Sequence, residues 1–174
     1  MIQSQQPIPQ QVYSFKLRGY QPFSGLVLTV GAIRTLLQSI PVDYALDGYR
    51  LVRNEAVLRA ERTESEEQVE TVLRLKEKVP GASPHLTLAS EVDLFEGWRL
   101  NQQLIAIYLR DDSCLVGIVR QVNRQSFRLQ LLSTKGQWLE EDTFLFKRIQ
   151  IVEVETDYLI SLQLLASYHQ SHSS

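Results

Sequence analysis

Apolar residues alternate with polar ones over much of the second half of the chain, which is the pattern of half-buried strands. The run 104–109 is apolar, contains two Ile and one Tyr, and is suited to a buried strand. The segment 115–122 alternates around Gly117, and residues 127, 129 and 131 are apolar with polar residues between them. Two further short strands are predicted around the apolar positions Phe144, Phe146, Ile149, Ile151, Val152 and Val154. Five short strands this close together predict a small closed barrel or a sandwich.

Three helices are predicted between and after the strands. Thr63 and Glu66 form a capping box before an amphipathic stretch that ends at residues 80–81, a Pro-Gly pair. The segment 90–98 is expected to form a short helix that leads into the strands of the second half. Asp157 is the expected cap of the last helix, which is apolar on too many sides for a solvated surface helix. We therefore expect this helix to be buried between the two halves of the chain or against a partner.

The first half of the chain repeats the pattern of the second. Residues 17–18 (Leu-Arg) match 109–110, and Gly25 matches Gly117, so the offset is 92 in both places (109 − 17 and 117 − 25). Residues 36–37 match 131–132 at an offset of 95, and residues 51–53 match 145–147 at an offset of 94. The order and the near-constant offset of these matches predict an internal duplication.

The predicted fold class is mainly β with helices, in the form of two tandem five-stranded small barrels, each followed by a helix. We expect a flexible tail over residues 1–12 and a first barrel with its helix over 13–80. A linker over 81–88 and a second barrel with flanking helices over 89–174 complete the expected organisation.

Composition narrows the class of protein. The 174 residues are 44% hydrophobic and 22% charged, which is typical of a globular protein and excludes disorder throughout. The net charge of -2 argues against a strongly basic nucleic-acid binder. The single cysteine, Cys114, cannot form an internal disulfide, which favours a cytoplasmic location. The first residues lack the basic and apolar regions of a signal peptide, and we expect no membrane-spanning segment.

A motif in the second repeat resembles a known family. It consists of Leu109, Arg110, Asp111, Asp112, Leu115, Gly117, Val119, Val122 and Asn123. This pattern is similar to the first conserved motif of the Sm-like (LSm/Hfq-type) superfamily, with Asn123 in place of the usual Asp. The resemblance implies a strongly bent five-stranded barrel of the SH3-like type, and residues 47–51 are also similar to small uncharacterised bacterial proteins built on this barrel.

The same resemblance implies RNA as a ligand, but this chain departs from the family at the residues that contact RNA. The loop Asn expected after the motif is absent, since residues 124–127 read Arg-Gln-Ser-Phe. The Arg-Gly pair expected before the last strand is replaced by residues 147–149, Lys-Arg-Ile. The motif is made mostly of structural residues, so the resemblance points to the fold more than to the function.

Basic side chains in the second repeat are the candidate nucleic-acid contacts. They are Arg120, Arg124, Arg128, Lys147 and Arg148, with Phe127 or Trp138 as a platform on which a base stacks. The alternative is a solvated face in which these cations pair with Glu140, Glu141 and Glu153. Residues 101–174 carry seven Lys and Arg against eight Asp and Glu, which favours the alternative.

Apolar side chains outside the expected strand cores are the candidate contacts with a protein partner. They are Tyr20 and Phe23 in a turn, Trp138 in a loop, and Leu162 and Leu165 in the last helix. The leading functional hypothesis is therefore a non-catalytic binding module that acts in protein–protein interaction or self-assembly. The alternative hypothesis is an RNA-binding Sm-like protein.

No enzymatic chemistry is predicted. No phosphate-binding Gly-rich loop, nucleophile elbow or paired Cys motif occurs, so we expect no catalytic residues, no small-molecule substrate and no cofactor. His169 and His172 lack the further ligands that zinc needs, so no metal site is expected. Cys114 has acidic neighbours, which disfavour a nucleophilic thiolate, and is expected to be half-buried.

Overall fold

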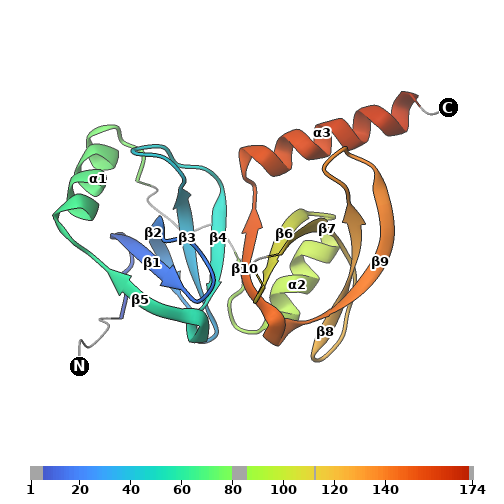
Figure 1. The fold of residues 1–174 in the computed structure, drawn as a ribbon, viewed down its shortest axis with the longest axis horizontal. Coiled ribbons are helices and arrows are strands. Elements are labelled where there is room, and N and C mark those ends of the chain that lie inside the picture. Colours follow the sequence, from blue (N-terminus) through green and yellow to red (C-terminus); the bar gives the residue numbers. More distant parts are fainter. Residues whose placement is uncertain (1–5, 80–85, 112, 173–174) are drawn as a thin grey trace. The chain divides into compact units, whose positions relative to one another are not determined.

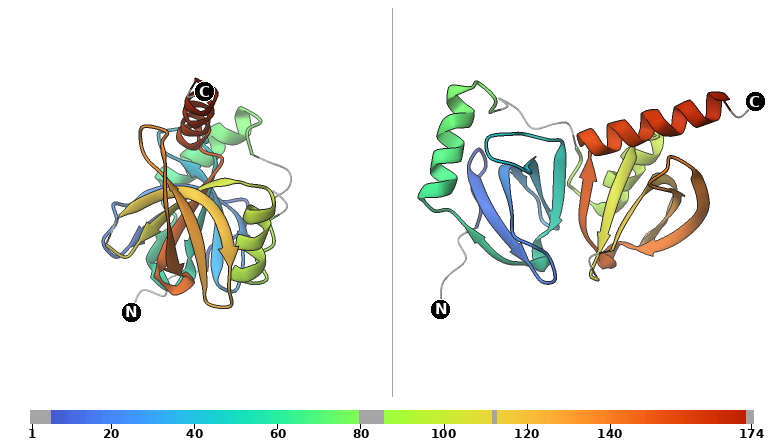
Figure 2. Two further views of the ribbon diagram at one scale, coloured as in Figure 1. Left: turned by 90° about the vertical axis from the view of Figure 1, so that its right-hand side faces the viewer. Right: turned by 45° about the horizontal axis from the view of Figure 1, so that its top comes forward.

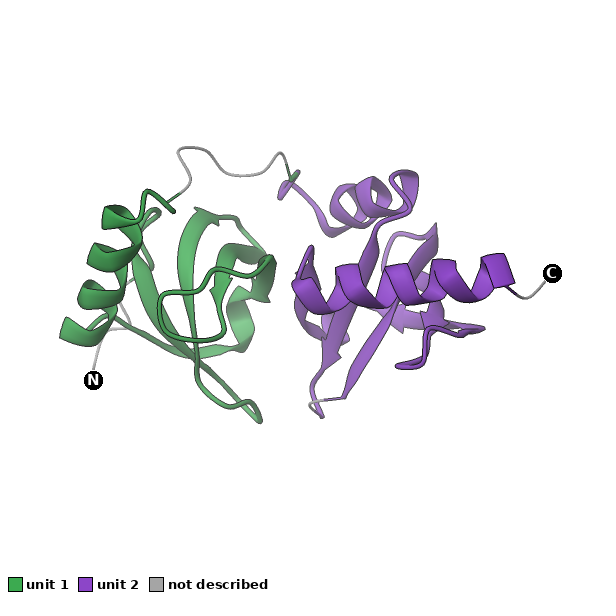
Figure 3. Cartoon of the chain, turned by 90° about the horizontal axis from the view of Figure 1, so that it is seen from above, with its two compact units in different colours: residues 1–86 green, residues 87–174 purple. Residues whose placement is uncertain are grey.

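The chain folds into two units of similar size. A computed structural model describes residues 6–79, 86–111 and 113–172. Residues 1–86 form unit 1 and residues 87–174 form unit 2 (Figure 3). The expected linker over 81–88 spans this boundary, and most of it lies outside the described residues. The fold is mainly β, with 43% of the described residues in strands and 28% in helices.

Unit 1 is a five-stranded antiparallel arrangement followed by one helix (Figure 1). Its elements are β1 (Val12–Leu17), β2 (Phe23–Val30), β3 (Arg34–Ile40), β4 (Tyr49–Arg53), the 3-10 turn η1 (Asn54–Ala56), β5 (Val57–Glu61) and α1 (Glu64–Leu75). The strands lie in the order β5-β1-β2-β3-β4, which places the last strand beside the first. In the described part of the unit β5 and β4 are not paired with each other, so the strand order is open.

Unit 2 has the same strand order with one more helix. Its elements are α2 (Glu91–Leu100), β6 (Leu104–Leu109), β7 (Cys114–Val122), β8 (Ser126–Leu132), β9 (Trp138–Leu145), the 3-10 turn η2 (Phe146–Arg148), β10 (Ile149–Val154) and α3 (Asp157–His172). The strand order is β10-β6-β7-β8-β9, again open, with β9 at the edge. Helices α2 and α3 lie on different sides of these strands (Figures 1 and 2).

The two units repeat each other pair by pair at one constant offset. Gly25 pairs with Ser39 and Gly117 with Leu131, both 92 residues further on (117 − 25 and 131 − 39). The same offset relates the outer pairs, since Ser14 faces Glu61 in unit 1 and Ala106 faces Glu153 in unit 2. The register shifts also correspond, at 27/29 in β2 and at 119/121 in β7. From the first to the last strand, neither unit therefore has an insertion relative to the other.

The constant register corrects two of the sequence matches. Residues 36–37 correspond to 128–129 and not to 131–132, because Leu36 faces Leu51 in unit 1 as Arg128 faces Thr143 in unit 2. Residues 51–53 correspond to 143–145 and not to 145–147. Phe146, which was predicted to lie in a strand, instead begins the turn η2.

Helix α2 closes one end of unit 2 with aromatic side chains. Phe95 is fully buried, and its ring centroid lies 4.3 Å from that of Phe127 and 5.0 Å from that of Phe146. Trp98 meets Phe95 edge-on at 4.9 Å, so it is a core residue, as the helical spacing indicates. Phe127 is 0% exposed, which contradicts its predicted role as a stacking platform, since no base can reach a ring inside the core.

Two helix starts test the predicted caps. The capping box of α1 is confirmed: the Thr63 side chain accepts from the backbone of Ser65, and Glu66 accepts from the Thr63 backbone N–H at 2.8 Å. The predicted cap of α3 is wrong by one residue. The hydroxyl of Thr156 accepts from Leu159 N at 3.3 Å, so Thr156 caps the helix and Asp157 lies in its first turn.

Glu70 fastens α1 to the first strand. Its carboxylate accepts from Val12 N at 3.1 Å, from Arg62 Nη1 at 2.7 Å and from Arg74 Nε at 3.1 Å. Burial by itself raises the pKa of this carboxyl. The hydrogen bonds from the Val12 backbone, Arg74 and Arg62 and the charge of Arg62 outweigh burial and leave the pKa below its ordinary value.

Glu70→Gln is expected to lower the melting temperature at neutral pH and to flatten its dependence on acid. A carboxyl whose pKa is lowered by folding stabilises the fold fully above its ordinary pKa, and this stabilisation is lost as the pH falls through the lower folded value. The loss at neutral pH is expected to be about 1–3 kcal/mol, because charged hydrogen bonds are removed. Thermal unfolding of both proteins by circular dichroism from neutral pH down to about pH 3 measures this.

The control for this measurement is Glu64→Gln, which changes an acidic residue of the exposed first turn of the same helix. In this variant the melting temperature should fall with decreasing pH as it does in the wild type. If the difference in melting temperature between Glu70→Gln and the wild type is the same at every pH, the stabilising role of the Glu70 charge is contradicted.

Candidate binding surface

Helix α3 is anchored to unit 2 by one of its sides. Leu159, Leu162 and Ala166 are buried in a cluster with the outward side chains of the strands, which are Leu104, Ala106, Val116, Ile118 and Leu132. Tyr108 and Trp138 pack against this cluster. Leu162, a predicted partner contact, is only 4% exposed, so it holds the helix in place and does not reach a partner.

The other side of α3 is apolar and exposed. The exposed fractions are 52% for Tyr158, 52% for Ile160, 68% for Leu164, 37% for Leu165 and 56% for Tyr168. Between residues 157 and 172 the only acidic or basic side chains are Asp157 at the start and His169 and His172 in the last turn. We call the five exposed apolar side chains, Tyr158, Ile160, Leu164, Leu165 and Tyr168, the outer face of α3. Leu165, predicted from the sequence as a partner contact, belongs to it.

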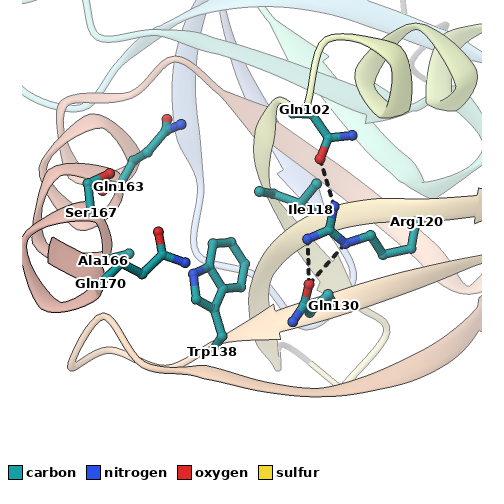
Figure 4. Close-up of a pocket in the computed structure, with 9 residues that line it drawn as sticks. All are labelled: Gln102, Ile118, Arg120, Gln130, Trp138, Gln163, Ala166, Ser167 and Gln170. Atoms are coloured by element: carbon teal, nitrogen blue, oxygen red, sulfur yellow. Dashed lines mark hydrogen bonds between the residues drawn. The ribbon is translucent and has the colours of Figure 1, made fainter. Parts of the chain in front are cut away.

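A pocket lies between α3 and the strands of unit 2 (Figure 4). Its volume is about 350 Å³, and its lining consists of Gln102, Ile118, Arg120, Gln130, Trp138, Gln163, Ala166, Ser167 and Gln170. Arg120 donates to the side-chain oxygen of Gln102 at 2.6 Å and to that of Gln130 at 2.9 and 2.6 Å. Two neutral amides thus hold this guanidinium in place.

Trp138 is a wall of this pocket and not an exposed loop residue. It is half-buried at the start of β9, and its indole Nε1 is buried without a hydrogen-bond partner among the described residues. Trp138 and Gln170 of α3 both line this pocket (Figure 4).

The sequence reasoning missed the glutamines of this pocket. Gln163, Ser167 and Gln170 follow one another at helical spacing and therefore share one side of α3. This spacing is the only signal that the sequence offers, because a neutral amide does not mark a site in the way that a charged or nucleophilic group does.

The structure separates the basic residues that were predicted to act together. Arg120 lies at the pocket beside α3, whereas Arg128 forms an ion pair with Glu141 at 3.3 Å on the exposed surface of β8 and β9. Arg124 and Lys147 line a different hollow of about 340 Å³, together with Glu91. The backbone hydrogen bond from Phe146 N to Gln125 O joins the two turns that carry them.

Arg148 is exposed on the same turn, η2, as Lys147. Of the predicted nucleic-acid contacts, Arg120 and Trp138 line the pocket beside α3, and Arg124 and Lys147 line a second hollow that also carries an acidic residue, Glu91.

The predicted docking turn of unit 1 is packed against its own unit. Tyr20 is buried, and its carbonyl accepts from Lys16 Nζ at 2.6 Å. Phe23 is half-buried, stacks on Phe15 at 5.9 Å and has the Arg50 guanidinium 4.3 Å above its ring. Both side chains already have contacts within unit 1.

Candidate chemistry is sparse in the described residues. No group of three or more His, Cys, Asp and Glu side chains there is placed to hold a metal ion. Cys114 is exposed, not half-buried as predicted. Tyr108 donates to Glu153 at 2.8 Å, and burial together with the charge of Glu153 raises the pKa of this phenol, so it acts as a hydrogen-bond donor and not as an acid.

Comparison with known proteins found no match among protein-family models, curated proteins or solved structures. Within the described residues, none of the helices combines the length and the apolar character that a membrane crossing requires.

Proposed function

We propose that this protein is a non-catalytic binding module that associates with a second copy of itself through the outer face of α3. The observation that carries the proposal is the exposure of five large apolar side chains on a helix that is already anchored by its opposite side. Contiguous apolar surface of this kind marks an interaction site.

The energies are of the right size for association. Full burial of a fully exposed side chain of this size contributes about 1.5–3 kcal/mol, and these five, which are 37% to 68% exposed, have roughly half of that left to gain. The loss of translational and rotational freedom costs at least about 4 kcal/mol. Burial of the outer face on both copies offsets this cost without any charged contact.

The arrangement of the face supports a second copy as the occupant. Ile160, Leu164 and Tyr168 are four residues apart and form one ridge along the helix, and such ridges interdigitate with those of an identical helix. A two-fold axis perpendicular to the helix makes the contact antiparallel and self-complementary. It also brings Asp157 of one copy to the end of the other copy that carries His169 and His172. A face with so little charge offers nothing to select a strongly charged partner.

The RNA-binding alternative has less support. Arg128 is ion-paired, Arg120 is held by two glutamines, and Phe127 lies in the core. The net charge of -2 also does not favour binding to phosphates.

The test is the molar mass in solution of the wild type and of Ile160→Glu combined with Leu164→Glu, over a wide range of concentrations. We expect a dimer for the wild type and a monomer for the variant, because two carboxylates would have to be buried at the interface. Far-UV circular dichroism checks that the variant is folded.

The control is Leu75→Glu, which introduces one such carboxylate on α1 at a side chain that is 80% exposed. This variant should remain dimeric. A wild type that is monomeric at every concentration, or a control that dissociates as the double variant does, would overturn the proposal.

A further inference from the structure

The two units differ at one end of their strands, and unit 2 shows what this end is built to hold. There α2 inserts Phe95 against Phe127 and Phe146, and all three rings are buried. The side chains of Leu94 and Trp98 are buried with them. An aromatic side chain carried by a helix therefore fills this end of unit 2.

Among the described residues of unit 1, which begin at residue 6, no helix lies at the corresponding end. At the constant offset of 92, Thr35 takes the place of Phe127, Asn54 that of Phe146, and Gln6 that of Trp98 (127 − 35, 146 − 54 and 98 − 6). A hollow of about 430 Å³ lies at this position. Its lining is Gln6, Pro7, Phe15, Val30, Gly31, Ala32, Thr35, Asn54, Val57 and Ala60.

The polar groups of this hollow present acceptors. The Thr35 hydroxyl donates its hydrogen to Asn54 Oδ1 at 2.8 Å. Asn54 Nδ2 donates its two hydrogens to the carbonyls of Gly31 and Ala32, at 2.8 and 3.3 Å. Oxygen lone pairs remain on Thr35, Asn54 and both carbonyls. Apart from the exposed amide of Gln6, the rest of the lining side chains are apolar.

We infer that the hollow of unit 1 binds an aromatic side chain with a hydrogen-bond donor, a Trp or Tyr of a partner protein. The apolar walls suit the ring, as the same end of unit 2 suits Phe95. The acceptors suit an indole N–H or a phenol O–H, which Phe lacks. This site is separate from the outer face of α3 and does not rest on the proposed function.

The test is an NMR titration of the full chain with 3-methylindole and with 1,3-dimethylindole, which has nearly the same shape but no N–H. We expect 3-methylindole to shift the backbone amides of Gly31, Ala32, Thr35 and Asn54. The dimethyl compound should bind about threefold to tenfold more weakly, because one hydrogen bond is lost. Equal binding of the two compounds, or shifts confined to other residues, would overturn the inference.

Two variants block the site in different ways. Thr35→Phe with Asn54→Phe fills the hollow with the rings that unit 2 has, and Ala60→Leu narrows it while keeping every hydrogen bond described above. Both should abolish the shifts at Gly31 and Ala32. Leu58→Gln is the matched control, because Leu58 is exposed on the same strand and is not part of the lining. Shifts that persist at full size in the folded Ala60→Leu protein would contradict the assignment.

Discussion

Gly117→Ala is expected to lower the free energy of unfolding of unit 2 by about 3 kcal/mol or more, one of the largest effects of any single methyl group in this protein. A Cβ at this position overlaps the carbonyl oxygen of Gln130 and lies 2.8 Å from Leu129 Cγ. The first of these atoms is backbone, so relief requires β7 and β8 to separate where Gly117 faces Leu131.

The measurement is urea unfolding followed by tryptophan fluorescence. Both tryptophans, Trp98 and Trp138, lie in unit 2, so the signal reports on the unit that is changed. The control is Gly97→Ala in α2, where an added Cβ meets no atom within 4 Å. This control should stabilise the unit by about 0.5–1 kcal/mol, because alanine is favoured over glycine within a helix. If the Gly117 variant unfolds within the error of the wild type, the close approach of the strands is wrong.

Phe95→Ala is expected to cost about 3–5 kcal/mol, the range for removing a fully buried ring. The ring contacts those of Trp98, Phe127 and Phe146, with centroids 4.3 to 5.0 Å away, so its removal leaves a cavity lined on three sides by aromatic groups. Because α2 is held to unit 2 through this ring, we also expect the fluorescence of Trp98 to shift to longer wavelength before the main unfolding transition.

The variant Phe95→Leu tests how much of the stability loss comes from the empty space that alanine leaves between α2 and the strands. Leucine fills most of the space, so this variant should lose less than half as much stability as the alanine variant. A second comparison is Phe23→Ala in unit 1, where the ring is half-buried and the tryptophan signal should not change. Equal losses from the alanine and leucine variants of Phe95 would argue against a packed aromatic end.

The sequence predicted local structure well where one residue type has one physical role. Thr63 and Glu66 make the predicted capping box, and the strand predicted over 104–109 is β6. The prediction from the sequence was wrong where the pattern does not show which side of a strand or helix faces the core. Phe127 alternates with polar residues whether it faces the core or the solvent, and the structure places it in the core.

The repeat was visible in the sequence, and the strand pairings confirm the offset of 92 that matches Gly25 with Gly117, whereas the offsets given further along the chain are wrong. Similar residues were matched with similar residues, which paired 36–37 with 131–132. The strand pairings instead equate Leu36 with Arg128 and Thr35 with Phe127. The two units share the backbone pairing, but the side chains at one end are polar in unit 1 and aromatic in unit 2, so a comparison of residue types drifts from the offset of 92.

For α3, the apolar character on too many sides led to the expectation of burial between the two halves of the chain or against a partner. The structure assigns Leu162 to the anchored side and Leu165 to the outer face, a distinction that composition does not contain. The pocket beside α3 was not foreseen, because its glutamines come from segments that are distant in the sequence.

The position of the last strand beside the first has a consequence for how the chain folds as it is synthesised. Ser14 cannot pair until Glu61 has been synthesised, and Ala106 cannot pair until Glu153 has. In each unit 47 residues separate the two paired positions (61 − 14 and 153 − 106). Contacts of such long sequence separation slow folding, and β1 and β6 each keep an open edge until their unit is nearly complete. Unit 1 can finish its sheet while unit 2 is still being made. Because α3 follows β10, the apolar outer face of α3 emerges after the strands that anchor it, which shortens the time in which the unanchored helix can aggregate.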